Sequence, residues 1–375
     1  MLTALLLALP ARADEPAPPD EVAPIPVAML SDLGSGQVLY DREPDRRFAP
    51  ASVTKVMTAY TAFGLIRAGR LQPGSVVTVD PVIAGEWNGK GSSLYLEGGQ
   101  QVPVDTLLHA ITTVSANDAA IVLATSSAGS VPAWADWMNA NARALGMTGS
   151  HFGTPNGWPD QGVTYVTARD LTKLASALLA RYPAEYRDYF GHKQLTFQGR
   201  TQENQDPAIG VVAGADGIKT GHTNEAGFNF LGSAERDGRR LIMVIAGAQT
   251  GEQRAAASRA LLEWGFAAWQ PRPLFASGAV VGQAKVQNGD TRSLPLTTRR
   301  SIAALFPKGQ TGPIGLRILY RGPLNAPIAK GSQVAELEIR SAGLPPGRVP
   351  LYAGASVREA GPIDRLVNGL MGPFS

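Results

Sequence analysis

Strand-like segments at both ends of the first 270 residues enclose a helical middle, and this order limits the fold more than any other feature. Apolar runs at 28–30 and 37–40 flank the turn-forming Gly34-Ser35-Gly36 and predict an antiparallel hairpin. Further strand-like runs return late in this part of the chain, at 217–220, 228–234 and 241–246. Asp237-Gly238 separates the last two runs and is typical of a tight hairpin turn. We therefore expect an α+β domain whose antiparallel sheet joins both ends of the segment.

The middle of this segment has helical periodicity. Apolar side chains recur every three or four residues after Ser52, which predicts a helix packed in a core. Thr167 is a candidate N-cap, with Asp170 three residues later. The same periodicity predicts further helices at 105–111, 118–128, 132–145, 168–181 and 252–268.

The length of 375 residues fits two domains, and 44% hydrophobic with 17% charged residues is typical of a folded protein. We assign residues 27–270 to the α+β domain. Residues 14–26 are rich in Pro, Glu and Asp and are expected to form a flexible leader. After Pro271-Arg272-Pro273, short apolar runs alternate with Gly and Pro, so residues 271–360 are predicted to form a small all-β sandwich.

The two ends of the chain carry targeting signals. A short apolar run at 2–9 precedes Ala11-Arg12-Ala13, so residues 1–13 are interpreted as a signal peptide. The basic residues that usually begin a signal are absent, and an N-terminal tail is the alternative. Residues 361–375 place apolar side chains on one helical face, which suits either peripheral membrane contact or a tail docked on its own domain. We expect an exported, periplasmic protein, peripheral on the inner membrane if the tail binds lipid.

Composition and spacing exclude several kinds of partner. The formal charge is only +3 and the basic residues are scattered, so nucleic acid is not expected. The absence of cysteine excludes disulfides and thiolate nucleophiles. Metal-ligand spacing is also missing from the four histidines, so we expect neither metal nor cofactor; they are His109, His151, His192 and His222.

Ser52 and Lys55 form the first candidate catalytic pair. A separation of one helical turn puts the hydroxyl and the amine on the same helix face. Lysine can act as a base when burial or a second cation lowers its pKa, and the helix N-terminus favours developing negative charge. In isolation, an exposed helix start would explain the pair equally well.

Two further motifs follow in order. Ser115-Ala116-Asn117 precedes a predicted helix, and helix capping alone would account for it. Lys219-Thr220-Gly221 ends a predicted strand, where the glycine allows a substrate backbone to approach; the alternative is an exposed edge lysine. All three motifs occur once each, on helix, loop and strand, and together they are typical of class A β-lactamases and penicillin-binding proteins.

From 28 to 270 the chain resembles the low-molecular-mass D-alanyl-D-alanine carboxypeptidases of the peptidase S11 group, which implies a β-lactamase/transpeptidase-like fold. Residues 272–360 resemble the family's C-terminal domain. The resemblance rests on several further stretches: Ser115-Ala116-Asn117-Asp118-Ala119, Leu145-Gly146-Met147, His151-Phe152, Asn156-Gly157, Thr167-Ala168-Arg169-Asp170-Leu171, Lys219-Thr220-Gly221-His222-Thr223 and Trp264-Gly265-Phe266.

The resemblance implies a role for each motif residue. Ser52 would be the nucleophile, Lys55 its base, and Ser115 the proton relay to the leaving amine. Asn117 would orient the substrate amide, and Lys219 would keep Lys55 partly neutral by repelling its charge. Thr220 and Arg254 would bind the terminal carboxylate. The backbone N–H groups of Ser52 and His222 would form the oxyanion hole, and Gly221 completes the third motif.

The expected function is a serine carboxypeptidase that removes the terminal D-alanine from peptidoglycan stem pentapeptides and is acylated by β-lactam antibiotics. A β-lactamase is less favoured, because Glu185 is followed four residues later by Tyr189 and not by Asn. Two further functions stay compatible with the motifs: a D,D-endopeptidase and a non-catalytic wall-binding scaffold.

Overall fold

The computed structural model describes residues 16–361, so the predicted signal peptide and nearly all of the predicted amphipathic tail lie outside the described residues. The chain divides into two compact units. The larger comprises Pro18–Leu33 and Leu39–Gly265, and the smaller includes Gly34–Val38 and the chain from Phe266 onward. No helix in the described part of the chain is long and apolar enough to cross a membrane.

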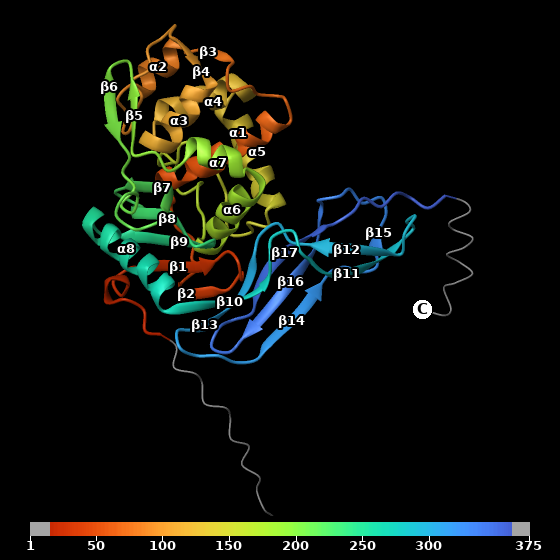
Figure 1. The fold of residues 1–375 in the computed structure, drawn as a ribbon. Helices are drawn as coiled ribbons and strands as arrows, with labels where there is room; N and C mark the ends of the chain where they lie inside the picture. The colour runs from red at the N-terminus through yellow and green to blue at the C-terminus, as the bar shows by residue number, and fades with distance from the viewer. Residues whose placement is uncertain (1–15, 362–375) are drawn as a thin grey trace, which may run out of the picture. The chain divides into compact units, whose positions relative to one another are not determined.

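A five-stranded antiparallel sheet forms the centre of the larger unit (Figure 1). Its strand order is β2 (Val38–Arg42), β1 (Val27–Asp32), β9 (Arg239–Ala248), β8 (Gly227–Arg236) and β7 (Ala215–Thr223). β1 pairs with β9, with Met29 opposite Val244. The predicted sheet that joins both ends of the segment is therefore confirmed, as is the α+β class.

Helices cover both faces of this sheet because successive strand residues point to opposite sides. On β1, the sulfur of Met29 accepts a hydrogen bond from Thr172 of α6 (Ala168–Arg181) at 3.7 Å. Leu30 points the other way, toward α8 (Gly251–Ala267). A side chain at Gly265 of α8 would lie 2.6 Å from Leu30, so only glycine allows this close packing.

The helical middle agrees with the periodicity. The single-turn helix η2 (Ala51–Thr54) leads into α1 (Lys55–Arg67), whose residues from Lys55 to Phe63 are all buried, as expected of a core helix. The other predicted helices correspond to α3 (Val104–His109) with η3 (Ala110–Val114), α4 (Asn117–Ala128), α5 (Val131–Ala144), α6 and α8. The elements not predicted are α2 (Pro81–Trp87), α7 (Pro183–Tyr189), and the hairpins β3 (Val76–Thr78) with β4 (Gln101–Pro103) and β5 (Gln194–Phe197) with β6 (Arg200–Glu203).

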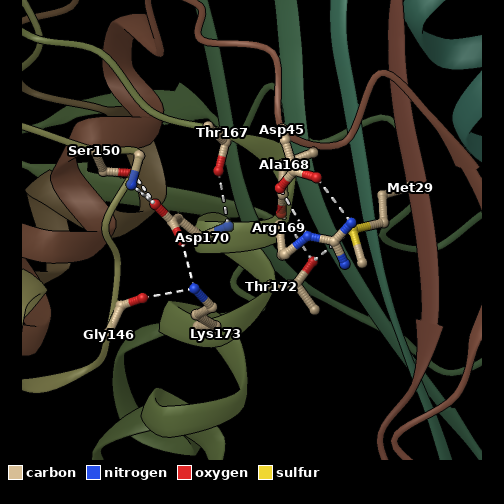
Figure 2. Close-up of polar contacts among 11 residues, drawn as sticks. Met29, Asp45, Gly146, Ser150, Thr167, Ala168, Arg169, Asp170, Thr172 and Lys173 are labelled. Carbon is tan, nitrogen blue, oxygen red and sulfur yellow. Dashed lines mark hydrogen bonds and ion pairs between the residues drawn. The ribbon is translucent and has the colours of Figure 1, made fainter. Parts of the chain in front are cut away.

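The start of α6 fastens the segment that leads to Ser52 (Figure 2). The Thr167 hydroxyl accepts the Asp170 N–H at 3.1 Å, which confirms the predicted cap. Arg169 donates two hydrogen bonds to Asp45, at 2.7 and 3.0 Å, and its N–H donates to the carbonyl of Pro44. Asp170, which is 2% exposed, accepts from the backbone N–H of Gly149 and from Lys173.

The smaller unit is all-β, as predicted. A six-stranded sheet has the order β14 (Ile314–Leu319), β16 (Gln333–Ser341), β17 (Gly347–Ala353), β12 (Ser293–Thr297), β11 (Val280–Gln287) and β15 (Leu324–Asn325). A second sheet pairs β10 (Trp269–Phe275) with β13 (Ile302–Pro307). Phe306 of β13 and Leu337 of β16 share one core, so the two sheets pack face to face.

One local prediction was wrong. The leader does not extend to residue 26, because η1 (Asp20–Val22) forms there and Val22 and Ile25 are fully buried. The free energy gained by burying these two side chains outweighs the tendency of the polar segment to stay disordered. Helix α8 ends at Ala267, before Pro271 and Pro273, and both prolines lie in β10, which has a single partner strand and therefore tolerates missing N–H donors.

We predict that Asp170→Ala lowers the free energy of unfolding by about 2–4 kcal/mol, because partly buried donors of the 146–150 loop lose their buried, charged acceptor. Urea unfolding followed by circular dichroism measures the change. Asp136→Ala, at an exposed position of α5, is the control and is expected to change stability by less than about 0.5 kcal/mol. Equal stabilities of the two variants would contradict this account.

Candidate active site

Ser52 and Lys55 are in direct contact at the start of α1. The amine of Lys55 donates to the Ser52 hydroxyl at 2.8 Å, to the side-chain carbonyl of Asn117 at 2.7 Å and to the backbone carbonyl of Asn156 at 2.8 Å. Lys55 is 1% exposed. The pair is therefore not an exposed helix start, and the amine is held by groups from three separate segments.

Two glycines allow the chain to close around Ser52. A side chain at Gly157 would lie 1.8 Å from the carbonyl oxygen of Ala51, and one at Gly221 would lie 2.5 Å from that of Pro50. Ala51 has a φ of +49°, a left-handed conformation that non-glycine residues rarely adopt. Gly221 was expected to admit a substrate backbone, whereas the segment that approaches it here is the chain's own.

The second motif lies where η3 meets α4. Neither Ser115 nor Asn117 caps α4, so the alternative of simple helix capping does not hold. Ser115 has φ +65° and is 6% exposed, and among residues 16–361 its hydroxyl has no hydrogen-bond partner. Asn117 instead bridges two segments, because its amide nitrogen donates to the carbonyl of Lys90 at 2.9 Å while its oxygen accepts from Lys55.

The third motif, Lys219-Thr220-Gly221, lies on β7, and two further candidate residues, His222 and Arg254, lie on β7 and α8. Lys219 and Thr220 are buried, which excludes the alternative of an exposed edge lysine. The amine of Lys219 donates to the carbonyl of Thr220 at 3.1 Å. His222 is exposed and stacks on Phe228, with 3.9 Å between ring centroids. Arg254 of α8 is only 8% exposed and donates to the carbonyl of Gln205 at 3.4 Å.

Burial and nearby charges change the titration of both lysines. The pKa of Lys55 lies well below its ordinary value, first because burial disfavours the charged form and second because Lys219 repels it; Asp118 acts in the opposite direction. Burial and then Arg254 lower the pKa of Lys219 to about 7, against the attraction of Asp206. A lysine that is neutral in part near neutral pH can accept a proton from a hydroxyl.

Several residues that shape this site had no predicted role. Asp118 accepts the N–H groups of Leu94 and Leu96 and so holds the 93–96 loop against α4. Asn229 of β8 donates to the carbonyl of Ala49 at 2.9 Å, three residues before Ser52. Asn156 and Asp118 lay within the family-like stretches, but Asn229 and Asp206 carried no recognisable signal.

The described residues, 16–361, contain no group of three His, Asp or Glu side chains that could hold a metal ion. The contacts around Ser52 instead come from hydroxyls, amines and amides. Such a set has the chemistry of a serine nucleophile with a buried amine as its base.

Comparison with known proteins agrees with this chemistry. Residues 15–250 match the family model described as D-alanyl-D-alanine carboxypeptidase, and residues 269–359 match that of the penicillin-binding protein 5 C-terminal domain. The chain is 33% identical over 345 residues to D-alanyl-D-alanine carboxypeptidase DacA of Escherichia coli K12, covering 91% of this chain and 85% of that protein.

Solved structures give the same result. Penicillin-binding protein 5 of Haemophilus influenzae aligns with a TM-score of 0.73 and 30% identity, covering 92% of this chain and 100% of that one. Penicillin-binding protein D2 of Listeria monocytogenes, in its ampicillin-bound form, aligns with a TM-score of 0.59 and 30% identity over 64% of this chain and 97% of that one. The chain belongs to the D-alanyl-D-alanine carboxypeptidase family, peptidase S11, with the C-terminal domain of penicillin-binding protein 5.

Proposed function

We propose that this carboxypeptidase removes the terminal D-alanine from peptidoglycan stem pentapeptides through an acyl-enzyme on Ser52. The observation that carries the proposal is the 2.8 Å contact between the Ser52 hydroxyl and the buried amine of Lys55. Because the pKa of Lys55 is lowered, part of the population carries a neutral amine whose lone pair accepts the hydroxyl proton.

Acylation then proceeds in balanced steps. The Ser52 oxygen forms a bond to the carbonyl carbon of the penultimate D-alanine while its proton passes to Lys55. The backbone N–H groups of Ser52 and His222 stabilise the oxyanion, at about 3 kcal/mol for each donor of this kind. The C–N bond breaks, and the leaving amine receives a proton through Ser115. Water then hydrolyses the ester and restores Ser52.

The remaining motif residues would bind the substrate. Asn117, which is hydrogen-bonded to Lys55 and to the carbonyl of Lys90, would orient the substrate amide. Thr220 of β7 and Arg254 of α8 would bind the terminal carboxylate, because a buried guanidinium forms strong charge-assisted hydrogen bonds to carboxylates. Lys219 contributes its positive charge to the same end of the site.

Three competing functions are less well supported. A β-lactamase would need a second carboxylate base, and Glu185 instead pairs with Arg67 at 2.9 Å. A scaffold would not need a buried lysine that is hydrogen-bonded to a serine, as Lys55 is to Ser52. An endopeptidase shares the chemistry and differs only in its substrate, so a comparison of substrates distinguishes it.

β-Lactams resemble the D-Ala-D-Ala end of the stem, and we propose that they acylate Ser52. The ampicillin-bound form of penicillin-binding protein D2 from Listeria monocytogenes supports this extension. We also propose that residues 1–13 direct export to the periplasm and that residues 361–375 give peripheral contact with the inner membrane. An absence of β-lactam adduct on an enzyme that releases D-alanine would contradict the first extension.

We predict that the protein lacking residues 1–13 releases free D-alanine from a synthetic peptide ending in D-Ala-D-Ala. Ser52→Ala is expected to reduce the rate at least ~1000-fold, because no other hydroxyl replaces the nucleophile. Circular dichroism checks that the variant remains folded. No release by a folded parent that cleaves cross-linked dimers would favour the endopeptidase, and no activity on either substrate would favour the scaffold.

We predict that Lys55→Ala abolishes acylation by a fluorescent penicillin while the protein stays folded, because the base for Ser52 is lost. Lys285→Ala, an exposed lysine of β11 in the smaller unit, is the matched control and is expected to acylate at the parental rate. Acylation of Lys55→Ala at a rate near that of the control would show that the base lies elsewhere.

We predict that acylation falls as the pH is lowered, because Lys55 is active when neutral and becomes protonated below its pKa. Lys219 lowers the pKa of Lys55, so Lys219→Gln, which removes the cation, is expected to raise that pKa. The acid limb of the pH profile of kcat/KM should therefore move to higher pH. A Lys219→Gln variant with reduced activity and an unmoved acid limb would assign Lys219 to substrate binding alone.

A further inference from the structure

Asp206 is a buried carboxylate that the proposed mechanism does not use. One of its oxygens accepts the backbone N–H groups of Ala208 and Ile209, at 2.8 and 3.1 Å. The other oxygen is buried and, within residues 16–361, has no hydrogen-bond partner. An ionised carboxylate with an unpartnered buried oxygen is costly, and positive charges nearby reduce that cost.

Two arginines of α8 hold the loop that carries Asp206. Arg254 donates to the carbonyl of Gln205, and Arg259 donates to the carbonyl of Pro207 at 2.7 Å. The two contacts lie on either side of Asp206 in the chain. The loop is thereby fixed next to the helix that supplies the proposed carboxylate ligand, Arg254.

The buried cations beside Asp206 are also incompletely paired. The Nε of Arg254 is buried and lacks a hydrogen-bond partner among residues 16–361, and the amine of Lys219 bonds only to the neighbouring carbonyl of Thr220 in that range. The charges that act on Lys219 are Arg254, which repels its charged form, and Asp206, which attracts it. Burial raises the pKa of Asp206, while its two backbone donors and both cations lower it. Burial and then Lys219 lower the pKa of Lys55, on α1, and Asp118 raises it.

We propose that Asp206 is a positioning residue of the carboxylate-binding site, where its buried carboxylate acts as the counter-charge of Lys219 and Arg254. Asp206 does not touch the reacting atoms. Its negative charge favours the protonated form of Lys219 beside the repelling Arg254, so that both cations are available when a substrate carboxylate arrives. The inference rests on the proposed function for the identity of that ligand, but the charge coupling itself belongs to the free enzyme.

Asp206→Asn separates charge from structure. The asparagine oxygen can still accept the N–H groups of Ala208 and Ile209, while the negative charge is removed. Asp80→Asn is the matched control, because Asp80 also accepts a backbone N–H, from Val82 of α2, but is exposed and is not among the charges that act on either lysine. Should Asp206→Asn not fold, Asp206→Ser keeps a short acceptor without charge.

The decisive measurement is the NMR titration of the Lys219 side chain in lysine-labelled enzyme, with the signal assigned by its loss in Lys219→Gln. The parent is expected to titrate with a pKa of about 7 and Asp206→Asn at lower pH, because an attracting negative charge is lost. Asp80→Asn should match the parent. An unchanged Lys219 midpoint in the folded, uncharged variant would overturn the proposal.

A binding experiment tests the functional half of the proposal. Isothermal titration of an acyl-D-Ala-D-Ala peptide into Ser52→Ala enzyme should show affinity that falls as pH rises through the Lys219 midpoint. In the double variant Ser52→Ala, Asp206→Asn, the same loss of affinity should occur at lower pH. A peptide that does not bind the Ser52→Ala enzyme at any pH would contradict the proposed function, while the NMR titration still decides on Asp206. Identical pH profiles of affinity for the Ser52→Ala enzyme with and without Asp206→Asn would overturn the functional role of Asp206.

Discussion

The burial of the Lys55 amine organises the whole site. Removing a cation from water is unfavourable, and the structure offsets this with three acceptors supplied by η2, α4 and the loop at Asn156. These segments are far apart in sequence, so the amine can be buried only when the larger unit is folded. The contact between Ser52 and Lys55 therefore forms as a consequence of the fold, and the lowered pKa of Lys55 follows from the same burial.

Close approach of backbones fixes Ser52 relative to the sheet. Gly157 and Gly221 let two other segments pass directly against Ala51 and Pro50, where any side chain would collide with a carbonyl oxygen. Asn229 holds the carbonyl of Ala49, and Arg169 holds Asp45 at the start of the same stretch. Ser52 is thus positioned by contacts along the entire segment that precedes it, and the helix that follows supplies Lys55 one turn later.

The predictable parts of the structure are those that depend on local pattern. The periodicity of 168–181, the Thr167 cap and the Asp237-Gly238 turn each act within a few residues, so the sequence alone indicates them. Burial of Val22 and Ile25 depends on distant partners, and this segment was mispredicted as a flexible leader. The conjunction of three motifs indicated Ser52, Ser115 and Lys219 as candidate site residues, but nothing local marks Asp206, whose proposed role depends on the charges around it.

The arrangement of charges around β7 would allow one site to hold the proposed neutral base and to bind the proposed anionic ligand. In the proposed mechanism, Lys219 adds to burial in lowering the pKa of Lys55, and the same cation must remain charged to bind a substrate carboxylate. Burial and then repulsion by Arg254 lower the pKa of Lys219, and attraction by Asp206 raises it, so that the pKa is about 7. A second arginine in place of Lys219 would keep its charge without adjustment, whereas a lysine can be tuned by its neighbours. The alternation of positive and negative groups therefore ties the basicity of Lys55 to the charge of the carboxylate-binding end.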